Sequence, residues 1–192
     1  MTKFLESGLR SRLPRRLWQD RAGASAVEFA LLLPVLLVLL AGLADLGHGL
    51  AVRRKVNQMA STAGEMISMQ TAWVSSDVSS ILSGVSSILQ PYDLDNLTIL
   101  LCVVDVDKKG HATVAWSSAY GTTALSAGQA SPVDIPEDLQ EEDVQMVVTR
   151  VQYKLNTIMS GLFGSLTGNG AYEYEQYFLT RPRNGDTITS TT

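Results

Sequence analysis

Residues 22–44, AGASAVEFALLLPVLLVLLAGLA, form a 23-residue stretch in which Glu28 is the only charged side chain. About 20 apolar residues in a helix are enough to cross the hydrocarbon core of a bilayer. Pro34 is compatible with such a helix, because other groups in a membrane protein can satisfy the carbonyl that proline leaves without its donor. The stretch therefore predicts a membrane-spanning helix near the N-terminus.

Charge is distributed unevenly around this stretch. Residues 1–23 carry six Lys or Arg against two Asp or Glu, a net charge of +4, so the remaining residues carry −8 within a total of −4. Six basic residues precede the span and three follow it closely, which predicts a cytoplasmic N-terminus and an extracytoplasmic C-terminal part. Nine of the fifteen Lys and Arg residues lie in this leader and at residues 53–55, and this concentration argues against a nucleic-acid partner.

A secretory signal peptide is an alternative interpretation of the same stretch. Gly42-Leu43-Ala44 offers small residues at the spacing that signal peptidase uses, so cleavage would leave a chain beginning at Asp45. The basic region is long for a signal peptide, however, and Glu28 is out of place in its apolar part. We therefore favour a helix that is retained.

The junction between leader and helix has a second feature, a glycine at Gly23 followed five residues later by Glu28. If a peptidase cut after Gly23, Glu28 would become the fifth residue of the mature chain. A carboxylate in an apolar helix is costly unless it finds a partner. The free amine of Ala24, or that of a neighbouring subunit, would supply the opposite charge. Alternatively, Glu28 lies at headgroup level in an uncleaved anchor.

The run RAGASAVEFALLLPVLLVLLAGLADLG, residues 21–47, resembles the N-terminus of TadE-like proteins, which are pilin-related components of tight-adherence (Flp) pilus systems. The resemblance implies cleavage by a prepilin peptidase between Gly23 and Ala24. It also implies a role for Glu28 and Phe29 in assembly and helix packing. Phe29 stands where the major Flp pilins usually have tyrosine, so the resemblance is to the TadE-like group and not to the major pilin.

The resemblance further implies a minor pilin or pseudopilin of a tight-adherence (Flp, type IVb-like) pilus, acting in pilus assembly or initiation and so in cell adhesion. Its partners would be the prepilin peptidase, other pilins or pseudopilins, the inner-membrane assembly platform and the membrane itself. The protein would cross the bacterial inner membrane once, with a periplasmic C-terminal domain, or would enter the extracellular pilus after assembly. The alternative is a permanently membrane-anchored periplasmic adaptor of a secretion or pilus complex.

Periodicity predicts two helical regions after the span. Small or apolar residues recur to Met69, so the first helix is expected to continue out of the bilayer, with Asp45 and His48 as a polar pair one turn apart. The serine-rich segment that follows repeats apolar residues every three or four positions, as an amphipathic helix does. The apolar positions are Leu50, Val56, Ala60, Ala63 and Ile67 in the first helix, and Val74, Val78, Ile81, Val85 and Ile88 in the second.

Four stretches are typical of strands, at residues 97–106, 111–118, 144–155 and 172–179. The fold class expected is α+β and pilin-like, with a long N-terminal membrane-spanning helix packed on a small antiparallel sheet of about four strands.

The domain organisation follows from these elements. Residues 1–23 form a basic prepilin-type leader, 24–70 the long helix, 71–182 an extracytoplasmic α+β domain and 183–192 a flexible Thr-rich tail.

The remaining motifs contain no catalytic pattern. The two histidines lie far apart, and no nucleophile motif, phosphate-binding loop or paired-cysteine motif is present, so we expect no enzyme and no cofactor. Asp105, Asp107 and Gly110 lack the later ligands of a calcium loop, so we expect no metal. Cys102 lies in an apolar run and is expected to be an inert core residue. An acidic run is interpreted as a solvated face or a docking site for a basic partner: Glu137, Asp138, Glu141, Glu142 and Asp143.

Overall fold

The computed structural model describes residues 21–107, 110–136, 145–157, 159–162 and 170–191. Helix α2 (Arg21–Ser68) is the longest element and includes Pro34. The chain divides into two compact units between Leu43 and Ala44, inside this helix. The first unit contributes the N-terminal part of α2, and the second unit contains the other elements described below.

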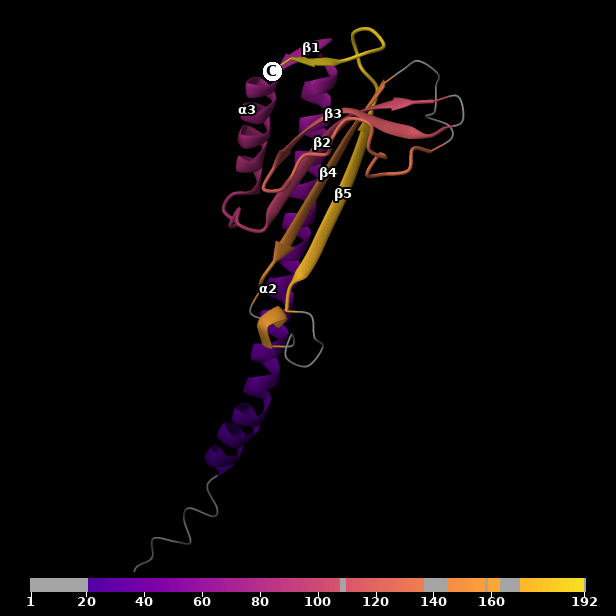
Figure 1. Cartoon of the computed structure of the whole chain (residues 1–192). Helices are drawn as coiled ribbons and strands as arrows, with labels where there is room; N and C mark the ends of the chain where they lie inside the picture. The colour runs from indigo at the N-terminus through magenta and orange to yellow at the C-terminus, as the bar shows by residue number, and fades with distance from the viewer. Residues whose placement is uncertain (1–20, 108–109, 137–144, 158, 163–169, 192) are drawn as a thin grey trace, which may run out of the picture. The chain divides into compact units, whose positions relative to one another are not determined.

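The second unit is built on a four-stranded antiparallel sheet (Figure 1). Strands β2 (Leu97–Val106) and β3 (Ala112–Tyr120) form a hairpin, while β4 (Gln145–Leu155) pairs with β2 and β5 (Tyr172–Thr180) pairs with β4. The order across the sheet is β3-β2-β4-β5. The predicted α+β fold with a four-stranded antiparallel sheet is confirmed.

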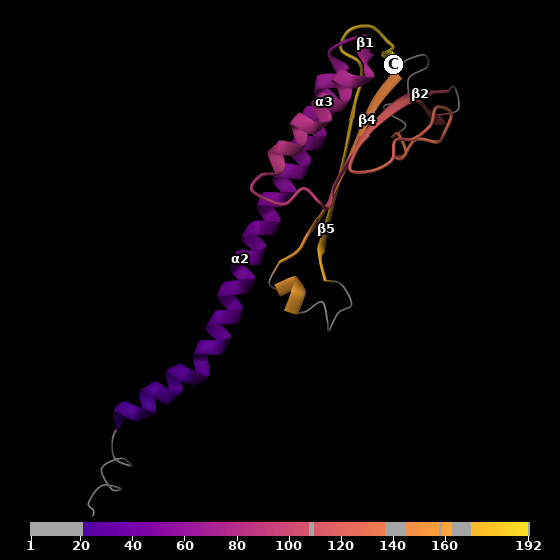
Figure 2. The same cartoon turned by 60° about the vertical axis from the view of Figure 1, so that its left-hand side comes forward.

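Two helices pack on one face of this sheet. The C-terminal part of α2 lies beside α3 (Ser75–Ser86), and α3 is extended by a short 3₁₀ turn, η1 (Ser87–Leu89) (Figure 2). Lys55 Nζ holds the end of this second helix by donating to the carbonyl oxygens of Ile88 and Gln90, at 2.8 Å each. A lysine is favourable there because carbonyl groups at a helix C-terminus lack intrahelical donors.

The second unit buries one side of α2. The buried apolar residues recur every three or four positions, with one adjacent pair, and so form one stripe on the helix. They are Val52, Val56, Met59, Ala60, Ala63 and Ile67, each 0% exposed. The predicted stripe is confirmed except at Leu50, which is 51% exposed because it falls on the opposite side of the helix.

The central strand β2 is buried on both faces. Ile99, Leu101 and Val103 face the helices, whereas Leu100, Cys102 and Val104 face a second apolar cluster. Val133 and Ile135, from the segment after β3, cover this second cluster. Burial on both faces explains why the strand is a continuous apolar run and does not alternate with polar residues.

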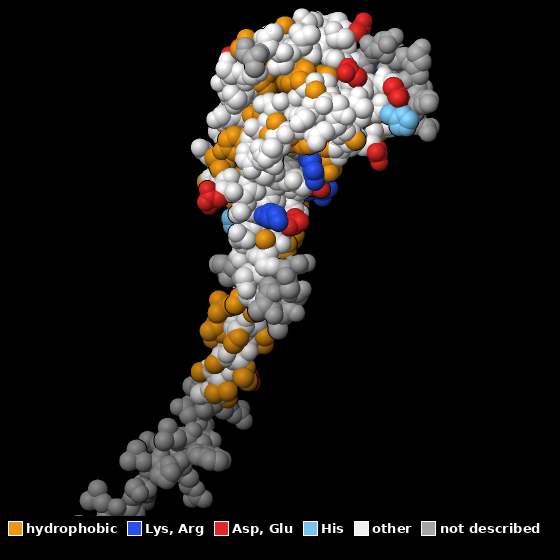
Figure 3. Space-filling model, in the orientation of Figure 1, with side chains coloured by type: hydrophobic (Ala, Val, Ile, Leu, Met, Phe, Trp, Pro, Cys, Tyr) orange, Lys and Arg blue, Asp and Glu red, His pale blue; other side chains and the backbone are white. Residues whose placement is uncertain are grey.

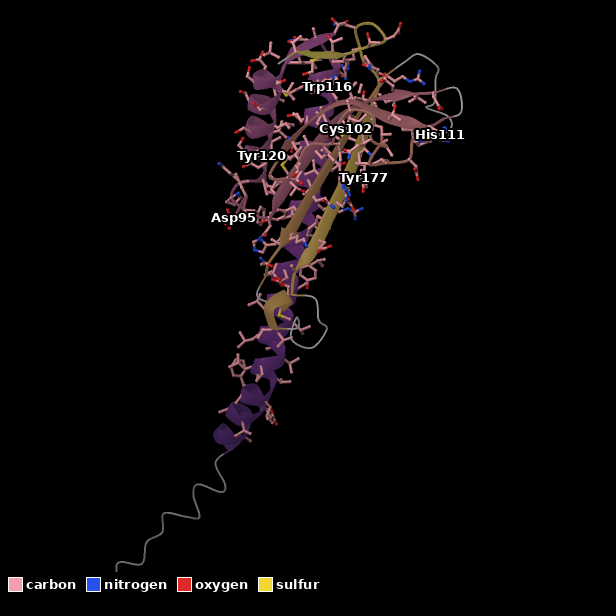
Figure 4. All side chains as sticks on the ribbon, viewed as in Figure 1. Asp95, Cys102, His111, Trp116, Tyr120 and Tyr177 are labelled. Carbon is pink, nitrogen blue, oxygen red and sulfur yellow. The ribbon has the colours of Figure 1, made fainter. Side chains whose placement is uncertain are left out.

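Cys102 lies inside the sheet (Figure 4), at 0% exposure. Burial raises the pKa of its thiol to about 12, because the thiolate would lose its hydration. The expectation of an inert core cysteine agrees with this environment.

The C-terminal residues differ from the flexible tail expected from residue 183 onward. Strand β6 (Thr189–Thr191) pairs in parallel with β1 (Ala72–Val74), and Ile188 is 1% exposed in the core. The indole N–H of Trp116 donates to the Ile188 carbonyl at 2.7 Å. The sequence did not predict this strand, because the segment is rich in threonine and Ile188 is its only buried apolar side chain. The strand that it pairs with also lies more than a hundred residues earlier in the chain.

Gly64 should be required for close packing between α2 and β5. A Cβ at this position would lie 2.7 Å from Phe178 Cδ1 and 3.2 Å from Thr149 Oγ1. Gly64→Ala should therefore lower the free energy of unfolding by about 1–3 kcal/mol. Urea unfolding of the full chain in mild detergent measures this change.

Gly84 is the matched control, because a Cβ there would meet nothing within 4 Å in the exposed part of α3. Gly84→Ala should raise the unfolding free energy by about 0.5–1 kcal/mol through helix propensity. Equal effects of the two substitutions would contradict the packing argument.

Cys102 should react with iodoacetamide at pH 8 only at the rate of unfolding, because its buried thiol stays protonated. A raised pKa also means that the folded state holds its proton more tightly than the unfolded state. Stability should therefore be full below the ordinary thiol pKa of 9.0 and fall between pH 9 and 12. Rapid alkylation under native conditions would show that the thiol is accessible.

Candidate functional site

The first unit contributes a stretch of apolar helix whose large side chains are all exposed in the part of the chain that the structure describes. Every large apolar side chain from Val27 to Leu43 is between 40% and 73% exposed. Hydrophobic side chains cover this part of α2 in Figure 3. Such a surface needs lipid or another protein to cover it, and the helix is long and apolar enough to cross a membrane.

The predicted processing site lies in the first turn of α2. Gly23 and Ala24 are the third and fourth residues of the helix and are exposed. Amides in a first helical turn have no intrahelical acceptor, so this turn can unwind at little cost. A Cβ at Gly23 would meet nothing within 4 Å, and the fold therefore does not require glycine at this position.

Glu28 and Phe29 follow one turn later, and both side chains are exposed. Among the residues that the structure describes, none donates a hydrogen bond or forms an ion pair with Glu28. Glu28 lies four residues beyond Ala24, a rise of about 6 Å along the helix. An amine on Ala24 would therefore lie on the same face of the helix as the carboxylate.

The acidic run proposed for docking, Glu137, Asp138, Glu141, Glu142 and Asp143, lies outside the described residues.

In the second unit, Asp45 holds the segment that follows β4. Its carboxylate accepts hydrogen bonds from the Thr157 hydroxyl and from the Met159 amide, the latter at 3.1 Å. Thr157 and Ser160 also bond reciprocally, since each backbone amide donates to the other residue's hydroxyl oxygen. The Met159 amide, at the start of a helical turn, thus shares the Asp45 carboxylate with the Thr157 hydroxyl, and helix termini favour a carboxylate in this position.

His48 does not pair with Asp45, although the two lie one turn apart. Its Nδ1 lies 3.1 Å from the Tyr92 hydroxyl, and the two rings meet edge to face. The structure thus gives each polar residue a separate partner far along the chain. The sequence suggested an Asp45–His48 pair because residue spacing identifies neighbours within one helix. It does not identify contacts with residues of other elements, such as Tyr92 and Thr157.

The aromatic residues of β5 divide between the two faces of the sheet. Tyr174 and Phe178 pack against the helix-side core, and Gly49 leaves room for the Tyr174 hydroxyl, which would lie 2.5 Å from a Cβ there. Tyr172, at the start of the strand, lies on the same helix-side face and is 45% exposed, whereas Tyr177 lies on the other face and is 39% exposed. Alternation along the strand therefore places three of its four aromatic side chains on the helix side of the sheet.

Glu175 anchors a polar cluster on that outer face which the sequence analysis missed. Its carboxylate accepts hydrogen bonds from Tyr177, Arg150 and Gln152, at 2.7, 2.6 and 2.9 Å. The bond from Tyr177, followed by those from Arg150 and Gln152, lowers the pKa of Glu175. Alternation along β4 and β5 was a signal for this cluster, but the register between the strands was needed to find it.

The other candidate ligands serve structural roles. Asp105 accepts a 2.8 Å hydrogen bond from Gln145, and His111 lies 3.1 Å from Asp107 at the tip of the β2–β3 hairpin (Figure 4). Within the described ranges, no three His, Cys, Asp or Glu side chains are placed to hold a metal.

The family model of TadE-like proteins matches residues 23–65. The match begins at the predicted processing site and covers the exposed apolar helix together with most of the packed part of α2. It confirms the resemblance to TadE-like proteins over this segment. Neither a curated protein nor a solved structure matches the chain significantly.

Asp45→Ala should destabilise the segment after β4. The substitution leaves the Thr157 hydroxyl and the Met159 amide without their acceptor, which should lower the unfolding free energy by about 1–3 kcal/mol. Faster hydrogen exchange at the Met159 amide would report the local opening.

Asp95→Ala is the control, because Asp95 is exposed and its carboxylate accepts no hydrogen bond within the described part of the chain. Its effect should stay within about 0.5 kcal/mol. Equal stability of both variants would show that Asp45 does not hold the segment.

Proposed function

We propose that this chain is a minor pilin or pseudopilin of a tight-adherence (Flp, type IVb-like) pilus, cleaved by a prepilin peptidase between Gly23 and Ala24 and acting in pilus assembly or initiation. The observation that supports this most directly is the exposed apolar helix, Val27 to Leu43, within the region that matches TadE-like proteins. The protein acts as a structural subunit and not as an enzyme.

Cleavage would change the electrostatics of the helix start. Before cleavage, Glu28 has no partner among the described residues. After cleavage, the Ala24 amine supplies a positive charge one turn away, or pairs with Glu28 of a neighbouring copy. Two such charges at 4 Å attract by about 1 kcal/mol in water and about four times as much at an effective dielectric constant of 20. The attraction is therefore stronger where lipid or another helix excludes water.

Cleavage would also free the helix to leave the bilayer. The leader carries six basic residues, and moving such charges through the hydrocarbon core is costly. Without the leader, the end of the helix is apolar apart from Glu28 and the new amine. The exposed side chains can then exchange lipid contacts for contacts with neighbouring helices, in which small residues permit close approach.

Gly23→Ala should block maturation in a host that carries the prepilin peptidase. Intact mass and N-terminal sequencing of the membrane protein should show a chain beginning at Ala24 for the wild type and at Met1 for the variant. Pilus yield should fall with the loss of processing, because the uncleaved leader holds the helix in the membrane.

Gly47→Ala is the control, since Gly47 lies in the same helix and a Cβ there also meets nothing within 4 Å. It should be processed normally. A wild-type chain that still begins at Met1 would refute maturation and favour the permanently anchored periplasmic adaptor. A chain beginning at Asp45 would indicate ordinary secretion.

Glu28→Ala should leave cleavage largely intact but weaken incorporation into the pilus, because the carboxylate acts after the leader has been removed. Quantifying the mature chain in membranes and in sheared pili separates these two steps. Glu28→Asp, which keeps the charge, should restore part of the incorporation, whereas Glu28→Gln should not. Normal pili from all three variants would contradict the proposed role of Glu28.

A further inference from the structure

A basic groove lies along α2 beside strand β5, outside the buried stripe. It has a volume of about 330 Å³ and is lined by Leu50, Arg53, Arg54 and Asn57 of α2 and by Gln176 of β5. All five residues belong to the second unit. The groove combines an apolar wall with two guanidinium groups and two side-chain amides, which are donors suited to an anionic oxygen ligand.

Arg53 and Arg54 have no internal role that explains their charge. Neither guanidinium makes a hydrogen bond or an ion pair with the residues that the structure describes. The adjacent Lys55 is engaged, because it holds the end of the α3–η1 segment through the carbonyls of Ile88 and Gln90. Of three consecutive basic residues in an acidic chain, two are therefore left for an external anion.

Apolar residues precede the arginines on the same face of the helix. Leu46 and Leu50 are 60% and 51% exposed, and residues 46, 50, 53 and 57 are spaced four, three and four apart. Asp45 lies on the domain side and is satisfied there by Thr157 and Met159. The helix thus becomes polar on its domain side at residue 45, while its outer side stays apolar for about another turn and a half.

This order of residues fits a helix that leaves a membrane. Arg53 lies eight residues beyond Asp45, a rise of about 12 Å. Side chains of an α-helix lean toward its N-terminus, so both arginines lean back toward the bilayer. The headgroup layer is roughly 5–8 Å thick on each side of the hydrocarbon core, within the reach of a long side chain that leans in this direction.

We propose that this groove binds an anionic phospholipid of the leaflet that α2 leaves at Asp45. Arg53 and Arg54 bind the phosphate, Asn57 and Gln176 border the headgroup, and Leu50 and Leu46 contact the upper part of an acyl chain. Lipid binding would explain why Arg53 and Arg54 follow the membrane span. Basic residues on the extracytoplasmic side otherwise oppose the rule that the more basic flank of a span stays in the cytoplasm. The proposal does not depend on cleavage at Gly23.

The first test measures which lipids the protein retains. The full chain is reconstituted in vesicles with equal parts of phosphatidylglycerol and phosphatidylcholine, extracted in mild detergent and weighed with its lipids by native mass spectrometry. The wild type should retain phosphatidylglycerol preferentially, with each arginine contributing roughly fivefold. The double variant R53Q/R54Q should retain the two lipids about equally.

Lys154→Gln is the control, because it removes a positive charge from β4 at a residue that does not line the groove. It should leave the lipid preference unchanged. An unchanged preference in R53Q/R54Q would overturn the proposal. Displacement of the retained lipid by millimolar inorganic phosphate would assign the groove to free phosphate and would also overturn it.

The second test measures how deeply the outer face of α2 is immersed in the membrane at residue 50. Leu50→Cys and Ser61→Cys place thiols on the same outer face of α2, three turns apart, and the buried Cys102 does not compete for the reagent. In phosphatidylglycerol vesicles, a membrane-impermeant maleimide should label Ser61→Cys at least about tenfold faster than Leu50→Cys, and the difference should shrink in R53Q/R54Q. Equal labelling rates would show that Leu50 is in water and would contradict the proposal.

Discussion

The packing of one stripe of α2 on the sheet is the constraint on which the second unit depends. Small side chains at Gly49, Ala60, Ala63 and Gly64 let the helix approach the strands closely, and the aromatic rings of β5 fill the space beside the two glycines. The fit leaves no room for larger residues, because interiors are packed as densely as organic crystals. The same side of the helix supports α3, which Lys55 holds in place.

Helix α2 has two parts that suit different surroundings, an apolar part before Asp45 and a part packed in the second unit after it. From Val27 to Leu43 the side chains are apolar on every side of the helix apart from Glu28, as suits lipid or a neighbouring helix. From Asp45 onward the helix has a domain side and an outer side with separate chemistry. Asp45 and His48 bind distant elements on the inner side, while Leu46, Leu50 and the two arginines remain outside. The change occurs within about one turn, which suits an element that leaves the membrane and enters a domain.

Several elements could be predicted because their signals are local. The central strands β2 and β4 are rich in β-branched residues, and the spacing of Val78 and Val85 marks the buried face of α3. The apolar span and the Gly23–Glu28 spacing also lie within one short segment, which is why the resemblance to TadE-like proteins could be recognised. The strand at Thr189–Thr191 and the Glu175 cluster could not be predicted, because each depends on residues far away in the chain.

The sequence by itself determined the membrane-capable helix, the position of Gly23 and Glu28 in it, and the succession of the two helices and the four strands of the main sheet. These follow from composition and periodicity, since a helix or strand is selected by residues only a few positions apart. Only the tertiary structure decided which polar residues are engaged and which remain free. Asp45, Lys55 and Arg150 find partners from 25 to 114 residues away, whereas Arg53 and Arg54 find none among the described residues. Hydrogen bonds of this kind depend on distance in space, and folding brings together residues that the order of the chain keeps apart.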